Sequence, residues 1–167
     1  MWHDHFLHLA TYNQWANTRL FDAVSQLSDE AYRADRGAFF GSIHGTLNHL
    51  LMADLLWIGR IAPPAFVTTG YDMIVEDERR SLRQRREAVD KRIIDTIKHL
   101  SEDEFDKPLS WITMEGEPKS ARLDKVLTHL FNHQTHHRGQ VHNMLSQTGH
   151  SPPTIDFFWV MFDPPTS

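Results

Sequence analysis

The stretch "HLFNHQTHHRGQVHN", residues 129–143, holds five histidines in fifteen positions. An α-helix turns about 100° per residue, so His129, His133 and His137 share one face of a helix. Gln140 continues this face, whereas the other two histidines point elsewhere. A pair of histidines at positions i and i+4 can bind one divalent ion. The stretch therefore predicts a long helix with a metal-binding face.

The helix that carries this face is predicted from about Arg122 to Ser146, because the residues "TGHSPP" stop it shortly afterwards. Apolar residues at helical spacing predict three more long helices. These cover about Asp4–Gln26, Ser42–Ile61 and Ile74–Leu100. Ser42 is a suitable N-cap, and the prolines of "APP" end the second helix.

No alternation of strands and helices is present, so we expect an all-α fold, a four-helix bundle in one domain over residues 1–167. The connections between the long helices run to a dozen or more residues. Such lengths permit crossovers, so we expect non-sequential connectivity. Alternating residues around Gly116 predict a short hairpin between the third and fourth helices. The last apolar piece, "IDFFWVMF" (155–162), is predicted to fold back as a short helix.

The second helix supplies the further ligand that two histidines need. Its residues "TLNHLLMADLLWIG" are apolar on almost all sides, which indicates a buried helix. His49 therefore lies inside the protein or at a cleft, and the best ligand set is His49, His133 and His137. Three neutral imidazoles on zinc or nickel leave an open coordination position, which is typical of catalytic sites. The alternative is a hydrogen-bonded histidine network, and His129 could replace one of the two ligands on the fourth helix.

Several polar residues of the predicted helices could act together with these three histidines. The residue after His133 is Gln134, which cannot act as the general base of an "HExxH" metalloprotease. Asp54 is either a buried partner for an arginine or histidine, or a functional carboxylate. Asn13 and Asn17 interrupt the apolar face of the first helix, and a buried amide needs a partner. They are either structural or in contact with the site or substrate.

Composition narrows the classes of function. The formal net charge of −5 disfavours a nucleic-acid-binding protein, which normally carries a basic surface. The absence of cysteine excludes disulfides, thiolate metal sites and cysteine nucleophiles. No apolar run reaches the length of a membrane span, and the first residues lack the pattern of a signal peptide. We therefore expect a cytoplasmic protein that acts on a small molecule, without nucleic-acid or membrane partners.

The segments "NHLLMADLLW" and "HLFNHQTHHRGQVHNML", with "YNQWAN" at 12–17, resemble the DinB family, which includes YfiT-like metalloenzymes. The resemblance covers nearly the whole chain, and "HxxHHRGQ" is its most specific part. It implies a four-helix bundle of unusual connectivity, often a homodimer. It also implies nickel or zinc bound by one histidine of the second helix and two of the fourth, here His49, His133 and His137.

The resemblance implies a transferase that activates a low-molecular-weight thiol such as bacillithiol, mycothiol or glutathione. A metal-dependent hydrolase and a non-catalytic metal-binding or stress-response protein are the alternatives. The transferase needs groups for a charged thiol beside the metal, and Arg60 and Arg138 are candidates. The hydrolase needs a base near a metal-bound water, and Asp54, His136 and His129 are candidates.

The tryptophans are expected to pack in the core at helical or hairpin positions; these are Trp15, Trp57, Trp111 and Trp159. Trp111 and the "FFWVMF" segment could instead line a pocket or a dimer surface. His3 lies third from the amino end and could chelate copper or nickel there, so a test of metal content must control for it.

Overall fold

The computed structural model describes residues 1–161, and it is predominantly helical. Five α-helices and a two-stranded sheet follow one another along the chain. They are α1 (Trp2–Ser25), α2 (Asp29–Arg33), α3 (Ile43–Ile61), α4 (Arg79–His99), β1 (Pro108–Ile112), β2 (Pro118–Arg122) and α5 (Leu123–Ser146). Two 3-10 helices, η1 (Glu102–Asp106) and η2 (Phe157–Val160), complete the described part. The prediction of a helical fold with a hairpin before the last long helix is confirmed.

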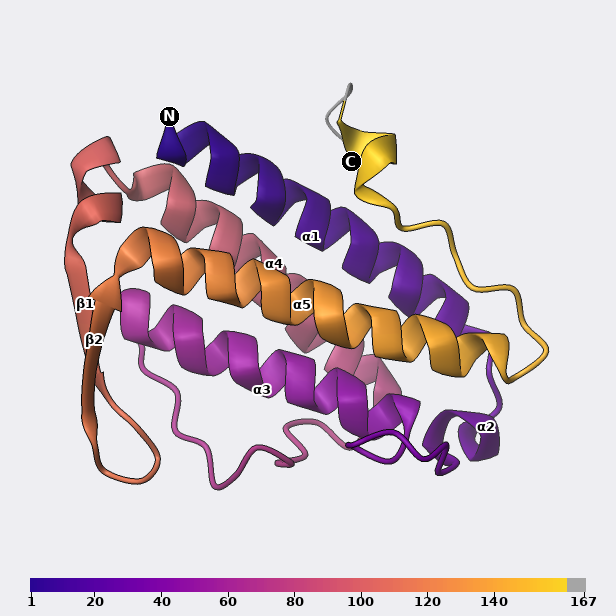
Figure 1. Ribbon diagram of the computed structural model, residues 1–167. Coiled ribbons are helices and arrows are strands. Elements are labelled where there is room, and N and C mark those ends of the chain that lie inside the picture. Colours follow the sequence, from indigo (N-terminus) through magenta and orange to yellow (C-terminus); the bar gives the residue numbers. More distant parts are fainter. Residues whose placement is uncertain (162–167) are drawn as a thin grey trace.

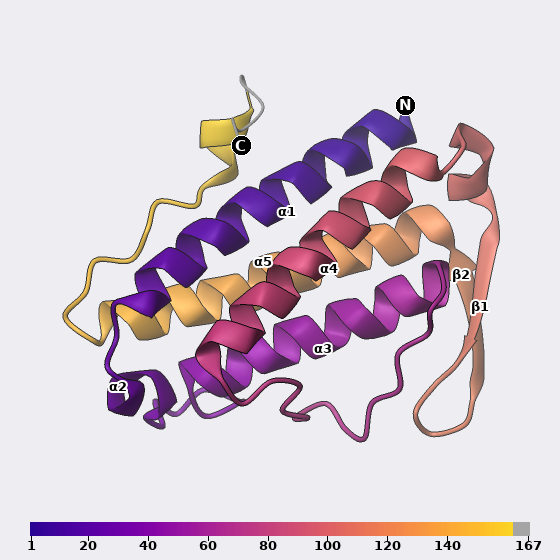
Figure 2. The ribbon, with the colours of Figure 1, turned by 180° about the vertical axis from the view of Figure 1, so that it is seen from behind.

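The four long helices lie side by side in an order that differs from their order in the chain (Figure 1). Helix α1 packs against α4 and α5, and α3 packs against the same two helices. Figures 1 and 2 show that α1 and α5 run in one direction and that α3 and α4 run in the other. The long helices α1 and α3, which follow one another in the chain apart from the short α2, therefore lie diagonally opposite each other, as do α4 and α5. The connections within these two pairs cross the end of the assembly.

A single apolar cluster fills the space between these helices. Each of the four contributes residues at helical spacing, which explains why the periodicity located them. Representative members are Phe6, Leu20, Leu47, Ile58, Leu82, Ile93, Leu127 and Leu130. Burial of such side chains contributes about 1.5 to 3 kcal/mol each, so this cluster holds the helices in register and fixes which faces meet.

The predicted boundaries agree with the structure except at one end. Ser42 is the N-cap of α3, and its hydroxyl accepts a hydrogen bond from the Gly45 backbone N–H. The predicted start of the third helix at Ile74 is wrong, because α4 begins at Arg79. The backbone N–H groups of Val75 and Glu76 instead donate to the side-chain oxygen of Asn48, at 2.8 and 2.9 Å. These bonds hold the α3–α4 connection against α3 in a non-helical path.

Two short helices were absent from the sequence prediction. Helix α2 begins after Ser28, whose hydroxyl accepts from the Ala31 N–H, and Tyr32 at its end is fully buried. The 3-10 helix η1 begins after Ser101, whose backbone N–H and hydroxyl both donate to the Glu104 carboxylate, and it buries Phe105. Each of the two follows a long helix and docks one aromatic side chain into the core. This contact anchors the start of the connection to the next long element.

The hairpin pairs Pro108 with Arg122 and Ile112 with Pro118 in antiparallel register. Its turn contains Gly116 with φ of +84°, a conformation that glycine adopts without strain. Inward-facing residues of the strands, Leu109, Trp111 and Ala121, pack against the helical core. The hairpin therefore covers one end of the helices, at the left of Figure 1.

The segment that follows α5 folds back over α1. Three side chains hold it through its backbone carbonyls: Tyr12 Oη donates to Ile155, Arg19 to Thr154 and His142 to Pro153. The predicted short helix is present as η2, although residue 162 of the predicted range lies outside the described residues. The expectation that Trp159 packs in the core is wrong, since 62% of its surface is exposed. Within residues 1–161, no helix has the length and apolar character needed to cross a membrane.

Candidate metal centre

The structure brings together the three histidines that the sequence singled out. One ring nitrogen of each of His49, His133 and His137 lies within 4.8 Å of the other two. His49 comes from α3 and the other two from adjacent turns of α5, which packs against α3. The Nε2 atoms of His49 and His133 are 3.1 Å apart. Two nitrogens bound to one ion at about 2.1 Å each lie roughly 3 to 3.5 Å apart, so this spacing suits a shared metal.

The orientation of His49 is set by the loop between α3 and α4. Its Nδ1 donates a hydrogen bond to the backbone carbonyl of Tyr71, at 2.7 Å. A proton on Nδ1 leaves the lone pair on Nε2, the atom that faces His133. Histidines that bind metals commonly donate their second nitrogen to a carbonyl in this way. The bonds from Asn48 to Val75 and Glu76 fix the same loop, so they hold the Tyr71 carbonyl in place.

His137 is oriented by its own helix. Its Nδ1 lies 2.8 Å from the side-chain oxygen of Gln140, one turn further along α5. The oxygen of an amide can only accept, so Nδ1 carries the proton and Nε2 is left as the free lone pair. The amide nitrogen of Gln140 in turn donates to Nε2 of His136, at 3.1 Å. His136 thus supports the amide that orients His137, and its ring is not among the three that converge.

Burial keeps the three imidazoles neutral. It lowers the pKa of His133 to about 3 and that of His137 to about 4, and it also lowers the pKa of His49. The rings of His49 and His137 also disfavour a positive charge on His133, and that of His49 disfavours one on His137. Metal binding requires unprotonated imidazole nitrogens, so the three residues are in the required form at neutral pH.

The donor set fits a zinc or nickel ion. Neutral imidazole nitrogen is a preferred ligand of both ions, and three such ligands leave at least one coordination position open. His133 Nδ1 is buried without a hydrogen-bond partner. Phe40 stacks on His49 with ring centroids 3.8 Å apart and meets the edge of His137 at 5.6 Å. The centre therefore has an aromatic wall on one side.

A buried polar network joins all four long helices and includes the residues next to His133 and His137 in the chain. Arg86 of α4 forms ion pairs with Asp54 of α3, at 2.8 Å, and with Asp90, at 2.9 Å. Asn13 and Asn17 of α1 donate to Asp90. The two asparagines are therefore structural partners of a buried carboxylate, which resolves the alternatives that the sequence left open.

The same network contains the residues that follow the two α5 histidines in the chain. Gln134 donates to Asp54, and Arg138 donates to Asn13. Asp54 is only 1% exposed and is engaged by Arg86, so it is a structural carboxylate and not a base at the metal centre. Arg138 is 2% exposed in this core, so it does not reach the histidine site as a thiol-binding group.

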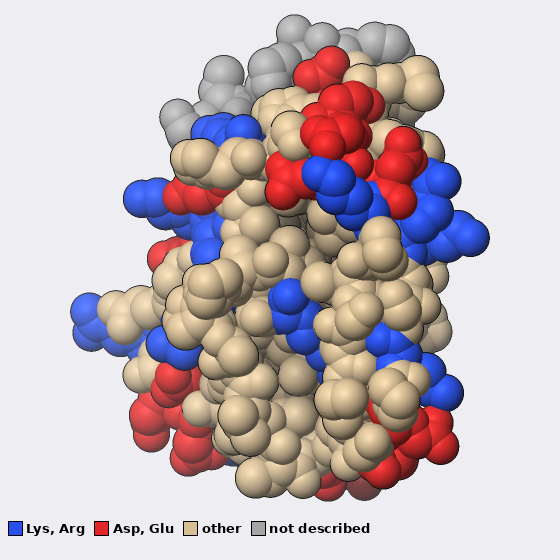
Figure 3. All heavy atoms as spheres, turned by 90° about the vertical axis from the view of Figure 1, so that its left-hand side faces the viewer, with Lys and Arg blue, Asp and Glu red and all other residues tan. Residues whose placement is uncertain are grey.

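A cavity of about 380 Å³ opens beside the histidines. Its lining joins α3, the loop after it, the hairpin and α5, and includes His49, Trp57, Arg60, Trp111, His129 and His133. His129 thus lies on the cavity wall one turn before His133, and the triad found by geometry excludes it. Seen from the hairpin end, the middle of the surface is mostly uncharged, with a few basic side chains among the others (Figure 3).

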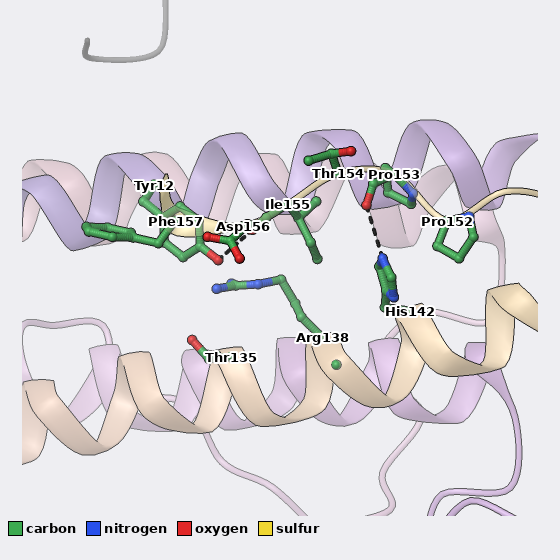
Figure 4. Close-up of a pocket in the computed structure, with 11 residues that line it drawn as sticks. Tyr12, Thr135, Arg138, His142, Pro152, Pro153, Thr154, Ile155, Asp156 and Phe157 are labelled. Carbon is green, nitrogen blue, oxygen red and sulfur yellow. Dashed lines mark hydrogen bonds between the residues drawn. The ribbon is translucent and has the colours of Figure 1, made fainter. Parts of the chain in front are cut away.

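A larger cavity lies elsewhere. It measures about 700 Å³ and is bounded by α1, α5 and the segment after α5. Figure 4 shows Arg138 projecting beneath Tyr12 and Phe157, with His142 bonded to Pro153 at the far end. None of the three convergent histidines lines it, so size alone would misplace the site.

Sequence reasoning missed some of the residues that shape the centre. Phe40 and Tyr71 act from loops, and Asn48 of α3 acts on the loop after it through its side chain. No motif marks such roles. Gln140 was visible as the continuation of the histidine face, although its bond to His137 was not.

Comparison with known proteins places the chain among relatives. It matches the model of the DinB family over residues 1–165. It is 28% identical over 164 residues to Protein DinB of Bacillus subtilis (strain 168), with 92% of each chain covered. Its fold is similar to the crystal structure of a DinB-like protein from Bacillus cereus ATCC 10987, with a TM-score of 0.71 at 19% identity. That similarity covers 90% of this chain and 95% of the other.

Proposed function

Because the chain belongs to the DinB family, we propose that it is a metal-dependent transferase that acts with a low-molecular-weight thiol. In this proposal His49, His133 and His137 bind one zinc or nickel ion. The thiol sulfur attacks a small electrophile in the adjacent cavity, a carbon–sulfur bond forms, and the leaving group departs with its electron pair. The proton of the thiol is released to solvent.

The observation that carries the proposal is the convergence of three neutral imidazoles at the edge of a cavity. His49 and His133 both line this cavity, so an ion held by them would be open to a small molecule. A divalent ion bound there would supply the positive charge that lowers the pKa of a thiol. A purely structural site would be closed by a fourth protein ligand, and the group of potential ligands found within residues 1–161 has only three members.

The chain's own residues would prepare the site before any substrate arrives. The Tyr71 carbonyl and Gln140 hold protons on Nδ1 of His49 and His137, which keeps the Nε2 lone pairs directed inward. Phe40 limits the access of water from one side. Of the bases that the sequence offered for the hydrolase alternative, Asp54 is paired with Arg86 and His136 is bonded to Gln140. The hydrolase alternative therefore depends on His129, which lines the cavity.

The proposal includes the finer architecture. We take the four long helices as one four-helix bundle domain with crossover connections, in line with the packing of α1 and α3 against α4 and α5. We also propose a homodimer. The exposed aromatic side chains of Phe158 and Trp159, 54% and 62% exposed, support it as a surface that a second copy could cover.

The test is a thiol-transfer assay on the metal-loaded protein. Chlorodinitrobenzene would be offered with glutathione, bacillithiol or mycothiol, and product formation followed by absorbance. We expect turnover with at least one thiol, its loss in His133→Ala/His137→Ala, and its retention in His5→Ala/His8→Ala, which removes two exposed histidines of α1. Turnover that survives loss of the α5 pair would overturn the proposal. Triad-dependent ester hydrolysis without any thiol would replace it with the hydrolase.

A further inference from the structure

Arg60 occupies an unusual position on the wall of the cavity beside the histidines. It lies in the last turn of α3, and its guanidinium stacks over the ring of Trp57 at 4.5 Å. The same group lies 5.6 Å from the ring centroid of Trp111, which reaches across from β1. The two indole rings meet edge to face at 5.2 Å. A guanidinium over an indole face is held by cation–π attraction, so the plane of Arg60 is fixed by its neighbours.

Arg60 has no acidic partner within residues 1–161. Two other half-buried arginines behave differently: Arg33 pairs with Asp29 and Asp77, and Arg83 with Asp22 and Glu87. Neither an ion pair nor a hydrogen bond of Arg60 occurs in the described part of the chain. A guanidinium carries five N–H donors in a planar fork. Those of Arg60 are therefore available to a ligand, and partial burial, which lowers its pKa, makes a counter-ion more valuable there.

Of the arginine and lysine side chains that line the cavity, Arg60 is the one without an ion pair within residues 1–161. Lys119 of β2 forms an ion pair with Glu117, at 2.9 Å. Glu115, the acidic residue of the cavity lining, lies in the exposed turn of the hairpin. The remaining wall is mainly apolar and aromatic, and includes Met52 and Leu56. The cavity thus combines a cation at one side, indole rings beside it and the histidine triad at another side.

We propose that this cavity binds a small molecule that carries a carboxylate, with Arg60 accepting the carboxylate in a bidentate pair and Trp57 and Trp111 packing against the apolar part. The pairing follows from geometry, because the fork of arginine matches the two oxygens of a carboxylate. The proposal refines the proposed transferase function. It rests on that function only for the assumption that the group reacting at the three histidines is a thiol. It selects thiols that bear carboxylates, such as glutathione and bacillithiol, over mycothiol, which has none.

The hairpin has a defined part in this recognition. Trp111, like Leu109, turns inward from β1, while its neighbours Ser110 and Ile112 are exposed. Because α3 supplies Arg60 and Trp57, the carboxylate site is complete only when the hairpin lies against the end of α3. The substrate preference is therefore a property of the α3–hairpin contact and not of the histidines.

The experiment compares two probes with the same peptide scaffold, glutathione and its diethyl ester, in which ethyl groups remove the charge of both carboxylates. Their affinities for the metal-loaded protein would be measured by calorimetry for the wild type, Arg60→Gln, Arg60→Lys and the control Arg85→Gln. Arg85 is an exposed arginine of α4. We expect the wild type and the control to prefer the acid by about tenfold, the lower range for charge-assisted hydrogen bonds. Arg60→Gln should lose the preference without weakening the ester, and Arg60→Lys should keep only part of it, because lysine cannot form the planar pair.

A preference for the acid that persists in Arg60→Gln, or a wild type that does not discriminate between the probes, would overturn the inference. The same measurement on His133→Ala/His137→Ala separates it from the proposed function. Retention of the acid preference there, together with failure of every thiol in the transfer assay, would support the carboxylate site and refute the transferase. Thiol transfer with an Arg60-independent preference would do the reverse.

Discussion

Replacement of Arg86 by methionine gives a sharp test of the polar network that lies behind the histidines. Arg86 is 3% exposed and is the cation that contacts both Asp54 and Asp90, which are 1% and 2% exposed. Burial raises the pKa of both carboxyls, and Arg86 opposes this by favouring their ionised forms. Methionine fills a similar volume without charge, so the change removes the ion pairs and leaves two carboxylates facing each other across the core.

Removing one partner of a buried ion pair costs about 3 to 5 kcal/mol. Both carboxylates keep amide donors, Asp54 from Gln134 and Asp90 from Asn13 and Asn17, so we expect the lower end, about 3 kcal/mol. For a chain of this length each kcal/mol lowers the melting temperature by about 2 to 4 °C. Arg86→Met should therefore melt roughly 6 to 12 °C below the wild type.

The assay is urea unfolding followed by circular dichroism, with thermal melts in parallel. Arg85→Met, at an exposed position of the same helix, is the control and should stay within about 0.5 kcal/mol of the wild type. Arg86→Met/Asp54→Asn restores the charge balance and should recover about 1 to 2 kcal/mol, since neighbouring charges are coupled. An Arg86→Met protein as stable as the Arg85→Met control would refute the description of this network as a set of mutually dependent charges.

Three further predictions concern the groups around the centre. Gln140→Ala should weaken zinc binding about 10- to 100-fold, as the loss of a partner of a ligand histidine usually does, measured by competition with a chelator; unchanged affinity would refute its orienting role. Asn48→Ala leaves the N–H groups of the α3–α4 loop unpaired and should lower the free energy of unfolding by about 1 to 3 kcal/mol in urea titrations, a loss that Asn48→Asp should partly repair. Burial and nearby Arg33 lower the pKa of His44, whereas Asp77 opposes this shift. The folded protein therefore favours the neutral ring. This contribution to stability is complete above about pH 6.5, the ordinary pKa of histidine, and is lost progressively as the pH falls below that value. The drop in unfolding free energy between pH 7.5 and 5.5 should accordingly be smaller in His44→Gln, and an equal drop would count against it.

The sequence predicted the parts of the fold in which apolar residues recur at the spacing of an α-helix. The four long helices follow from apolar spacing, and α3 from its capping serine and terminal prolines. The start of α4 could not be predicted, because Val75 and Glu76 have helix-compatible side chains and are held out of the helix by Asn48, 27 residues away. Helix α2 is too short for periodicity to register, with five residues. Its stability comes from the burial of Tyr32.

The convergence of the three histidines was predictable from the sequence, but their surroundings were not. Spacing on α5 placed His133 and His137 on one face, and the apolar character of α3 marked His49. The choice between His129 and His137 as the partner of His133 depends on the register of α5 against α3. Only the packing of the two helices sets this register. Arg60 and Arg138 were equal candidates in the sequence. Only the tertiary structure separates the arginine on the cavity wall from the one in the core network.

The most direct test of the account is the metal content of protein purified without an affinity tag or added metal. The wild type, His3→Ala and His133→Ala/His137→Ala would be measured together by elemental analysis, before and after reconstitution with zinc or nickel. We expect about one ion per chain in the first two, the stoichiometry of a single three-histidine site, and none in the third. Metal retained at the same level by the His133→Ala/His137→Ala protein, or no metal in any of the three after reconstitution, would contradict it.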